Sequence, residues 1–414
     1  MFLIIALVTL SVIFYQFGKS SMNFFSERIL NTRRSFIRDI LEVAGKPEVI
    51  SFAGGLPNPD LFPVAEIAEA CQKVLATDSK GALQYAKTQG YHPLRSWIAG
   101  RYKQQYGMDV EADDILITNG SQQGIDLIGK VFLNEGDPVV VEKPGYLGAL
   151  QALSMYQPEF HPVALTEEGI NLDELKRTIK NASIKLIYSV PSFQNPTGIT
   201  YSESVRRETA ELLRENNILF VEDNPYGELR FMGSDIAPVK SFCMDNVLLL
   251  GSFSKVVVPS FRLGWVCARK EFIEKLIVAK QASDLHSSSF VQRVINQVLV
   301  DHNMDDHIDA IREVYKKQRD AMVNAIKAHF NGDIKCTKPE GGMFLWADLP
   351  DGMSSMKLFD AAVKKDVAFV PGFPFYCDDG GESTMRLNYS NADEASIDIG
   401  IKRLADAFYE LKDN

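Results

Sequence analysis

The chain has 414 residues and a formal net charge of −10, from 44 Lys and Arg against 54 Asp and Glu. Its 46% of hydrophobic residues can bury a core, which excludes a mainly disordered chain. The acidic balance argues against nucleic acid as the main partner, because phosphate binding favours a basic face.

The N-terminal residues Met1 to Gly18 carry no charge and include the run FLIIALVTLSVIFYQF. A membrane-spanning helix needs about 20 apolar residues, so this run is borderline. It is also a poor secretory signal, since no Lys or Arg precedes it and no clear cleavage site follows. Three interpretations compete: a membrane anchor, a degenerate signal, or sequence upstream of a true start at Met22. We favour the last, and expect any membrane contact to be confined to residues 1–21.

Two features indicate the cellular compartment of the protein: its cysteines, and the arginines that follow the apolar run. Five widely spaced cysteines form no Cys-x-x-Cys motif, which argues against a disulfide framework and a structural zinc site. If the apolar run inserts into a membrane, its basic C-terminal flank would keep the body on the cytoplasmic side. That flank contains Arg28, Arg33, Arg34 and Arg38. We therefore expect a cytoplasmic protein with reduced thiols and no metal ion.

After residue 50, short apolar runs alternate with segments of helical period. This alternation predicts βαβ units around a largely parallel, buried sheet. The expected strands are ILIT (115–118), PVVVE (138–142), KLIYSV (185–190), ILFVED (218–223), VLLLGS (247–252) and LGWVCA (263–268). From about residue 301, a long charged helix pattern precedes short strands, which indicates a smaller α+β domain. We expect an N-terminal arm at 22–50, a large domain at 51–300 and a small domain at 301–414.

The segment TNGSQQGIDLIG (118–129) directly follows the first expected strand. A tight Gly turn with Ser121 as helix N-cap would point free backbone N–H groups at an anion. Taken alone, an ordinary strand-to-helix turn explains the segment better. It nearly spells a P-loop, but Val131 stands where Ser or Thr must reach magnesium, which argues against nucleoside triphosphate binding. No Gly-x-Gly-x-x-Gly follows a strand, so a dinucleotide site has no support.

Polar residues end two further strands. VPSFQNPTG (190–198) has strong turn chemistry around Asn195, and FVEDNPYGEL (220–229) ends its apolar run with Asp223 and its acidic and amide neighbours. Ligands of open α/β sheets bind at the carboxyl ends of strands, where an acid can hold a cationic group. In isolation, a structural turn and a solvated acid are fair alternatives.

The stretch LLLGSFSKVVVPSFRLGW (248–265) is the most informative. An expected buried strand delivers Lys255, flanked by two serines, into aliphatic surroundings. Desolvation lowers the pKa of such a lysine and frees its amine as a nucleophile. The serines, with Arg262 seven residues on, can hold a phosphate. A surface turn with a chance lysine is the weaker interpretation, because aliphatic side chains stand on both sides.

From about Met22 onward, the chain resembles the fold-type I, pyridoxal-phosphate-dependent aminotransferases of class I/II. It is most similar to the branch that includes 2-aminoadipate, kynurenine and aromatic aminotransferases. Beyond the order and spacing of the motifs above, the resemblance is carried by ISFAGGLPNPDLFP (50–63), LQYAKTQGYHPLR (83–95), EKPGYLGAL (142–150), SFSK (252–255), KPEGGMFLW (338–346) and MRLNYSNA (385–392). It implies an α/β fold with a three-layer α/β/α large domain, a mainly parallel sheet and a smaller α+β domain.

The resemblance implies pyridoxal 5′-phosphate as cofactor and assigns residues around its ring. Lys255 would bond covalently to the cofactor and move the substrate proton. Asp223 would pair with the pyridinium nitrogen, so that the ring can accept electrons. Asn195 and Tyr226 would donate to the phenolic oxygen, with Asn195 also bordering the substrate. Tyr146 would stack on the ring face.

The resemblance also assigns contacts to the phosphate and the substrate. The phosphate ligands would be Ser121, the backbone at Gln122, Ser252, Ser254 and Arg262. Tyr85 would reach the phosphate from the neighbouring subunit, which implies a homodimer with shared active sites. Arg386 would clamp the substrate α-carboxylate through two hydrogen bonds. Gly55 would lie in a loop that covers the substrate.

The implied activity moves an amino group from an L-amino acid of the 2-aminoadipate, aromatic or branched-chain type to a 2-oxo acid. The resemblance favours 2-oxoglutarate as acceptor and ping-pong kinetics. One alternative is a lyase or decarboxylase on the same scaffold. A less favoured one is a non-catalytic effector-binding regulator, because the region before the large domain leaves no room for a DNA-binding module.

Overall fold

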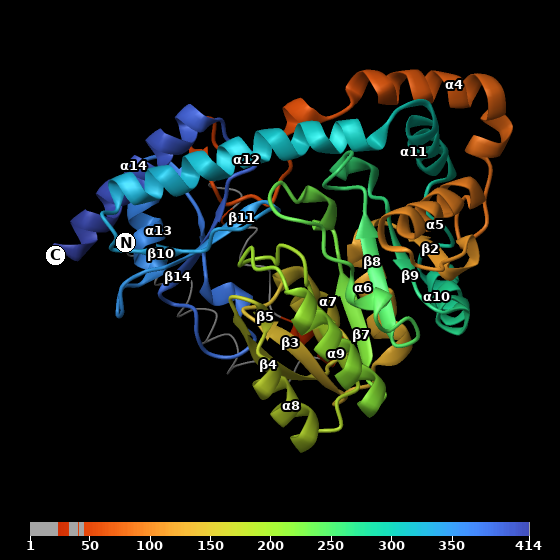
Figure 1. Ribbon diagram of the computed structural model, residues 1–414, viewed down its shortest axis with the longest axis horizontal. Coiled ribbons are helices and arrows are strands. Elements are labelled where there is room, and N and C mark those ends of the chain that lie inside the picture. Colours follow the sequence, from red (N-terminus) through yellow and green to blue (C-terminus); the bar gives the residue numbers. More distant parts are fainter. Residues whose placement is uncertain (1–23, 33–39, 41–44, 414) are drawn as a thin grey trace.

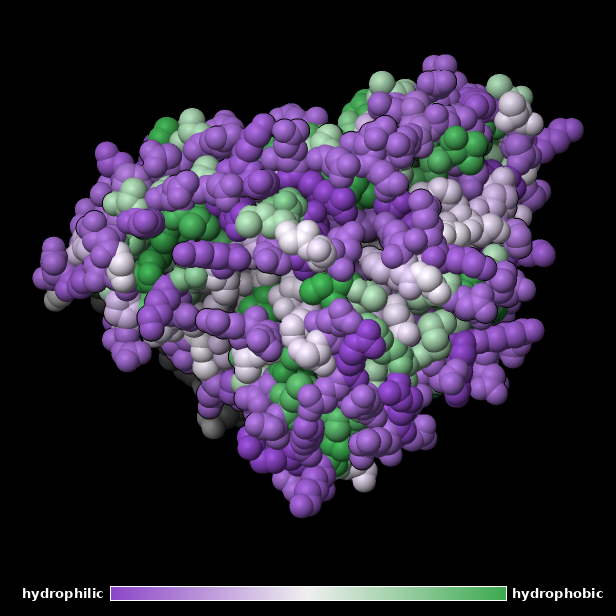
Figure 2. All heavy atoms as spheres, in the orientation of Figure 1, coloured by the Kyte–Doolittle hydropathy of each residue, from purple (hydrophilic) through white to green (hydrophobic). Residues whose placement is uncertain are grey.

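The computed structural model describes residues 24–32, 40 and 45–413. Residues 1–21, which contain the apolar run, therefore lie outside the described residues, and so do the three interpretations of that run. In the part that is described, no helix is both long and apolar enough to cross a membrane. The face seen in Figure 2 is mainly hydrophilic, with hydrophobic side chains in scattered groups.

The largest sheet within the described residues has eight strands (Figure 1). Their spatial order is β2 (Ile115–Thr118), β9 (Gly264–Cys267), β8 (Val247–Ser252), β7 (Leu219–Asp223), β6 (Leu186–Ser189), β3 (Pro138–Lys143), β4 (Glu159–Thr166) and β5 (Gly169–Ile170). Strands β8, β7, β6, β3 and β4 pair in parallel, whereas β9 is antiparallel to both neighbours and β5 to β4. All six predicted strands are present, which confirms the mainly parallel sheet. The last two strands in this order were not predicted.

A second, antiparallel sheet is built from the C-terminal part of the chain. Its order is β10 (Lys335–Cys336), β11 (Phe344–Asp348), β14 (Thr384–Asn388) and β13 (Val370–Pro371). A separate short pair joins β1 (Ile50–Ser51) to β12 (Val367–Ala368) in parallel. The segment after the N-terminal arm therefore pairs with the C-terminal region. The domain bounds 22–50, 51–300 and 301–414 stay a prediction.

Helices surround both sheets (Figure 1). They are α2 (Glu27–Asn31), α4 (Val64–Leu83), α5 (His92–Tyr106), α6 (Gly120–Phe132), α7 (Leu147–Ser154), α8 (Leu172–Asn181), α9 (Glu203–Asn216), α10 (Lys270–Ser283), α11 (Ser289–Asp301), α12 (Met304–His329), α13 (Ser355–Val363) and α14 (Glu394–Lys412). The long helix α12 runs across the top of the view and joins the part around β8 to the part around β11. It is the long charged helix expected from the sequence.

Alternate residues of the central strands pack into two different cores. Val139 and Val141 of β3 belong to the cluster that includes side chains of α6, whereas Val140 belongs to a cluster with side chains of α8 and α9. The same alternation separates Leu186 from Ile187 on β6. Because both faces are covered, the strands are apolar throughout rather than alternating with polar residues. The predicted three-layer α/β/α arrangement is confirmed.

The start of α6 differs from the prediction. Ser121 is not the N-cap, because the helix begins at Gly120 and its N-cap is Asn119. The Asn119 N–H donates to Gln123 Oε1 at 2.8 Å, so a side chain from inside the helix satisfies this terminal donor. Gly120 has φ +74°, a left-handed conformation that favours glycine. Ser121 therefore lies within the first turn.

Candidate active site

The segments that follow five strands of the large sheet, β2, β3, β6, β7 and β8, surround one cavity of about 310 Å³. Asp223 is the last residue of β7, and Lys255 lies just beyond the end of β8. Twelve of the thirteen predicted site residues line this cavity: Gly55, Ser121, Gln122, Tyr146, Asn195, Asp223, Tyr226, Ser252, Ser254, Lys255, Arg262 and Arg386. Most of them meet because the carboxyl ends of parallel strands share one edge of the sheet, whereas Gly55 follows β1 and Arg386 lies on β14.

Tyr85 is the predicted site residue that does not line this cavity. Its side chain is 80% exposed, just after the end of α4. Its ring contacts the edge of His286, with ring centroids 5.8 Å apart. The neighbouring backbone is fixed as well, because the Ala86 N–H donates to His286 Nε2 at 3.3 Å. The chain thus presents Tyr85 outward, away from its own cavity.

Lys255 is partly buried and lines the cavity. Its Nζ donates to the carbonyl oxygen of Gly55 at 2.8 Å. Burial, with smaller contributions from the charges of Arg386 and Arg262, lowers the pKa of the Lys255 ammonium to about 8. A far larger fraction of this amine is therefore neutral near pH 7 than of an exposed lysine, as a nucleophile or base requires.

The reactivity of Lys255 in the cofactor-free protein should follow this lowered pKa. The neutral amine reacts and the ammonium does not, so labelling should increase with pH and reach half its maximum near pH 8. Reductive methylation with mass spectrometry of the Lys255 peptide measures this midpoint. Replacing Arg386 by Gln removes a nearby positive charge, so it should raise the midpoint. A midpoint near the ordinary lysine value would contradict the proposed environment.

Asp223 presents one free carboxylate oxygen. The Tyr188 hydroxyl donates to Asp223 Oδ2 at 2.7 Å, whereas buried Oδ1 has no hydrogen-bond partner among the residues that the structure describes. Burial raises the pKa of Asp223 to about 7, and the Tyr188 hydrogen bond opposes this increase. A buried acceptor without a donor is costly, so this oxygen is suited to a ligand N–H group.

Arg386 lies on β14 of the second sheet and also lines the cavity. Its Nη1 donates to Asn195 Oδ1 at 2.9 Å, and its Nη2 donates to the Ala53 carbonyl at 2.6 Å. The guanidinium also packs over the ring of Phe344, 4.5 Å from its centroid. These contacts fix a buried cation whose Nε has no partner in the described part of the chain. Its fork of donors is suited to a carboxylate.

A second cationic wall is built where α6 begins. Arg262 Nη1 donates to Ser254 Oγ at 3.4 Å, and the Ser254 N–H donates to Ser252 Oγ at 3.1 Å. A Cβ at Gly120 would lie 2.5 Å from Arg262 Nη2, so a side chain there would displace the guanidinium from this position. Hydroxyls, a guanidinium and the first turn of α6 suit a phosphate group.

A buried carboxylate behind the cavity supports the loop that carries Asn195. Glu142, at the end of β3, accepts hydrogen bonds from Ser189 Oγ, Tyr201 OH, the Val190 N–H and Gln194 Nε2. Gln194 Oε1 in turn accepts from both the N–H and the hydroxyl of Thr197. These bonds tie the turn on both sides of Asn195 to a neighbouring strand. Asn195 then donates to the Tyr226 hydroxyl at 3.4 Å.

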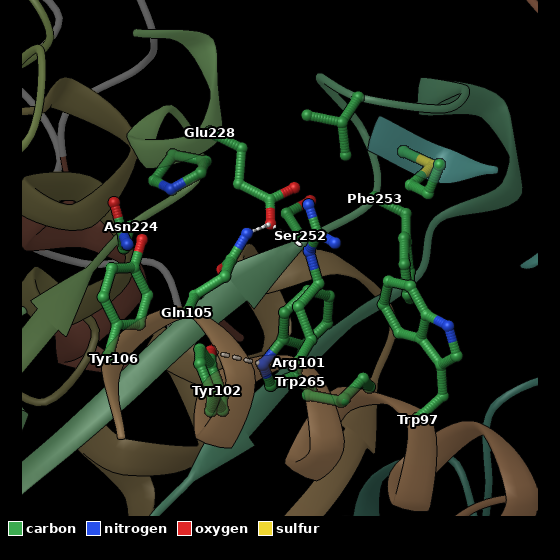
Figure 3. A pocket seen from close by; sticks show the side chains of 14 residues that line it. Trp97, Arg101, Tyr102, Gln105, Tyr106, Asn224, Glu228, Ser252, Phe253 and Trp265 are labelled. Carbon is green, nitrogen blue, oxygen red and sulfur yellow. Dashed lines mark hydrogen bonds and ion pairs between the residues drawn. The ribbon is translucent and has the colours of Figure 1, made fainter. Parts of the chain in front are cut away.

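A smaller cavity lies between α5, the segment after β7 and the Ser252–Phe253 segment (Figure 3). Trp265 Nε1 donates to the Tyr102 hydroxyl at 2.8 Å, and Arg101 pairs with Glu228. The ring of Phe253 lies 4.9 Å from that of Trp265. These contacts connect Phe253, two residues before Lys255, to α5 through Trp265, and they connect Glu228 to α5 as well.

The sequence interpretation missed Tyr188 and the Glu142 network. Tyr188 lies in the predicted strand 185–190, and Glu142 ends the predicted strand 138–142. A polar side chain in or at the end of a buried run is the signal that could have found them. In the described residues, no group of three or more His, Cys, Asp or Glu side chains could hold a metal ion.

Comparisons with known proteins connect this cavity to a family. The family model for aminotransferases of class I and II matches residues 47–404. The chain is 43% identical to aromatic-amino-acid aminotransferase 1 of Thermococcus litoralis, covering 94% of each chain.

Two solved structures are similar across the whole fold. One is a kynurenine aminotransferase of Pyrococcus horikoshii in complex with PMP, with 42% identity, a TM-score of 0.90 and coverage of 94% of this chain and 97% of that chain. The other is an alpha-aminoadipate aminotransferase of Thermus thermophilus, complexed with N-(5′-phosphopyridoxyl)-L-leucine. It has 38% identity and a TM-score of 0.88, over 94% of this chain and 98% of that chain.

Proposed function

Because the chain belongs to the aminotransferases of class I and II, we propose that its donor is a 2-aminoadipate, aromatic or branched-chain L-amino acid and its acceptor is 2-oxoglutarate. Family membership establishes amino-group transfer and pyridoxal 5′-phosphate as cofactor. The observation that supports the proposed site most is the meeting of Lys255, Asp223 Oδ1 and Arg386 at one cavity. An amine, an unpaired acceptor and a fixed cation are the groups that this chemistry needs.

The residues present fit the cofactor. Asp223 Oδ1 has no hydrogen-bond donor within the described residues, and the protonated ring nitrogen of the cofactor would supply one. The wall formed by Ser252, Ser254 and Arg262 would hold the phosphate, together with Ser121 and Gln122 at the start of α6. When bound, pyridoxal phosphate accepts the electron pair released as the substrate Cα–H bond breaks. We assign the ring face to Tyr146 and the phenolic oxygen to Asn195 and Tyr226.

The chain's own residues would then bind the substrate and move its proton. Arg386 holds the α-carboxylate, since its unpaired Nε and remaining N–H groups can donate to both oxygens. Lys255, whose lowered pKa leaves a larger fraction of its amine neutral, takes the proton from the substrate Cα. We assign Gly55, whose carbonyl accepts a hydrogen bond from Lys255, to the loop that covers the substrate. The two half-reactions use the same cavity in turn, which gives ping-pong kinetics.

A panel of amino donors tests the proposed substrate class. L-2-Aminoadipate, L-kynurenine, aromatic and branched-chain amino acids would each be assayed with 2-oxoglutarate, with alanine and aspartate as comparison donors. We expect the highest kcat/KM within the first group, and glutamate as the second product. A clear preference for alanine or aspartate, or no activity with 2-oxoglutarate, would contradict this proposal.

We further propose a homodimer in which Tyr85 serves the partner's cavity. Tyr85 is 80% exposed, and further exposed apolar side chains lie on α4 and α11, two helices that pack against each other, and in the turn before α11. They include Leu75, Leu83, Leu285 and Val300. A hydroxyl that donates to phosphate would contribute about 1.5–3 kcal/mol.

Heterodimers of two defective subunits test this arrangement. In a dimer of one Lys255→Ala and one Tyr85→Phe subunit, one site would combine an intact Lys255 with the other subunit's intact Tyr85. We expect that doubly tagged heterodimer to bind cofactor covalently at one site with wild-type affinity. The Tyr85→Phe homodimer should bind it about tenfold or more weakly. A heterodimer no better than that homodimer, or a monomer in solution, would contradict the shared site.

We propose a cytoplasmic location for the enzyme body. All five cysteines carry free thiols, three of them only partly buried. Free thiols persist in reducing compartments, whereas oxidising ones favour disulfides. This supports the location expected from the sequence.

A further inference from the structure

Tyr188 and Asp223 lie on adjacent parallel strands, within one face of the sheet. Tyr188 of β6 is in register with Val221 of β7, and Asp223 follows two residues later on the same face. Both side chains are 2% exposed, and the Tyr188 hydroxyl donates to Asp223 Oδ2 at 2.7 Å. The two residues are 35 apart in sequence, and the register of the two strands brings them into contact.

The hydroxyl of Tyr188 is not needed for packing. The ring belongs to the large apolar core, where phenylalanine would fill the same space. A buried hydroxyl costs free energy unless it is hydrogen-bonded, and its partner is the one carboxylate that ends β7 at the cavity. The Tyr188 hydroxyl therefore occupies Asp223 Oδ2, and Asp223 Oδ1 remains available to a ligand in the cavity.

We propose that Tyr188 is a positioning residue for the cofactor ring: its hydroxyl holds Asp223 Oδ2, so that Oδ1 faces the ring nitrogen of pyridoxal phosphate. A carboxylate free to rotate would present either oxygen, whereas one with a fixed oxygen is preorganised for a single donor. This inference rests on the proposed role of Asp223.

The hydrogen bond also affects the charge of the pair. Burial and the nearby Glu142 carboxylate both raise the pKa of Asp223, while the Tyr188 hydroxyl opposes them. Without that hydroxyl, the proton would shift from the ring nitrogen toward the carboxyl group. The ring would then carry less positive charge and bind less tightly. The nitrogen that joins Lys255 to the cofactor would become more basic.

Tyr188→Phe tests the proposal, and the chain offers a matched control. Tyr201 is also fully buried and its hydroxyl also donates to a buried carboxylate, that of Glu142, which keeps three other donors. For each full-length holoenzyme, the cofactor dissociation constant is measured by ultrafiltration. The pH midpoint of its visible absorbance band is measured by titration.

We expect Tyr188→Phe to weaken cofactor binding about tenfold or more and to shift the absorbance midpoint upward. Tyr201→Phe should leave both close to wild type, with any effect confined to thermal stability. Wild-type affinity and midpoint in Tyr188→Phe would overturn the proposal. If Asp223→Ala also left the cofactor affinity and the absorbance midpoint unchanged, the proposed role of Asp223 itself would be wrong. If Asp223→Ala had a large effect and Tyr188→Phe had none, only the proposed role of Tyr188 would be rejected.

A second variant keeps the test independent of folding. Incorporation of 3-fluorotyrosine at position 188 retains the hydroxyl and makes it a stronger donor. We expect it to shift the absorbance midpoint downward, opposite to Tyr188→Phe. An unchanged midpoint, or a shift in the same direction for both variants, would contradict the proposed hydrogen bond.

Discussion

Replacing Lys255 by alanine is expected to lower turnover by roughly 10⁴-fold or more and to abolish covalent attachment of the cofactor. The amine at Lys255 Nζ is the buried base that the cavity provides, and burial brings its pKa down to about 8. Few contacts are lost, chiefly the hydrogen bond to the Gly55 carbonyl. The melting temperature should therefore change little. Cofactor spectra, turnover and thermal unfolding measure the three effects.

Lys255→Arg separates chemistry from charge in this prediction. Arginine retains the positive charge but stays protonated, so it can neither attach to the cofactor nor take a proton from Cα. We expect it to be as inactive as Lys255→Ala. Normal turnover in either variant would refute the assignment of Lys255, whereas activity in the arginine variant alone would indicate a purely electrostatic role.

Replacing Asp223 by alanine has the second largest expected effect. Loss of one partner of a buried ion pair costs about 3–5 kcal/mol, which corresponds to roughly 10²–10⁴-fold in affinity or rate. We expect weaker cofactor binding and slower turnover together, because the same oxygen would hold the ring and keep its nitrogen protonated. Equilibrium cofactor binding and single-turnover kinetics measure the two effects.

Glu142→Gln is the matched control for Asp223→Ala. Glu142 is also a fully buried carboxylate near the cavity, but its hydrogen bonds all come from the protein. Its replacement should lower stability and disturb the Asn195 turn, with a smaller effect on cofactor affinity. Equal losses of affinity in the two variants would contradict a specific role for Asp223, as would unaltered kinetics in Asp223→Ala.

Much of the fold could be predicted because buried parallel strands have a simple sequence pattern. The run VLLLGS (247–252) is β8 residue for residue, and ILIT (115–118) is β2. Strand β4 was missed, because its partly exposed residues do not form a continuous apolar run. The residues that follow the strands, including Asn195 and Lys255, could then be placed at one edge from topology alone.

Details that depend on three-dimensional contacts were not available from the sequence. The start of α6 at Gly120 depends on the side chain of Gln123, and Ser121 was wrongly expected as N-cap. The Tyr188 contact depends on the register of two strands. Tyr85, by contrast, was assigned through family resemblance, and its place outside the chain's own cavity leaves its role a prediction.

The central claim is that this cavity transfers an amino group, and a single half-reaction tests it most directly. The holoenzyme is mixed with L-2-aminoadipate or an aromatic amino acid, without any 2-oxo acid, and its absorbance and products are followed. We predict that the band of the pyridoxal form gives way to that of the pyridoxamine form, with one 2-oxo acid released per bound cofactor. Retention of the pyridoxal form with every amino acid, or release of ammonia or carbon dioxide instead, would contradict the account.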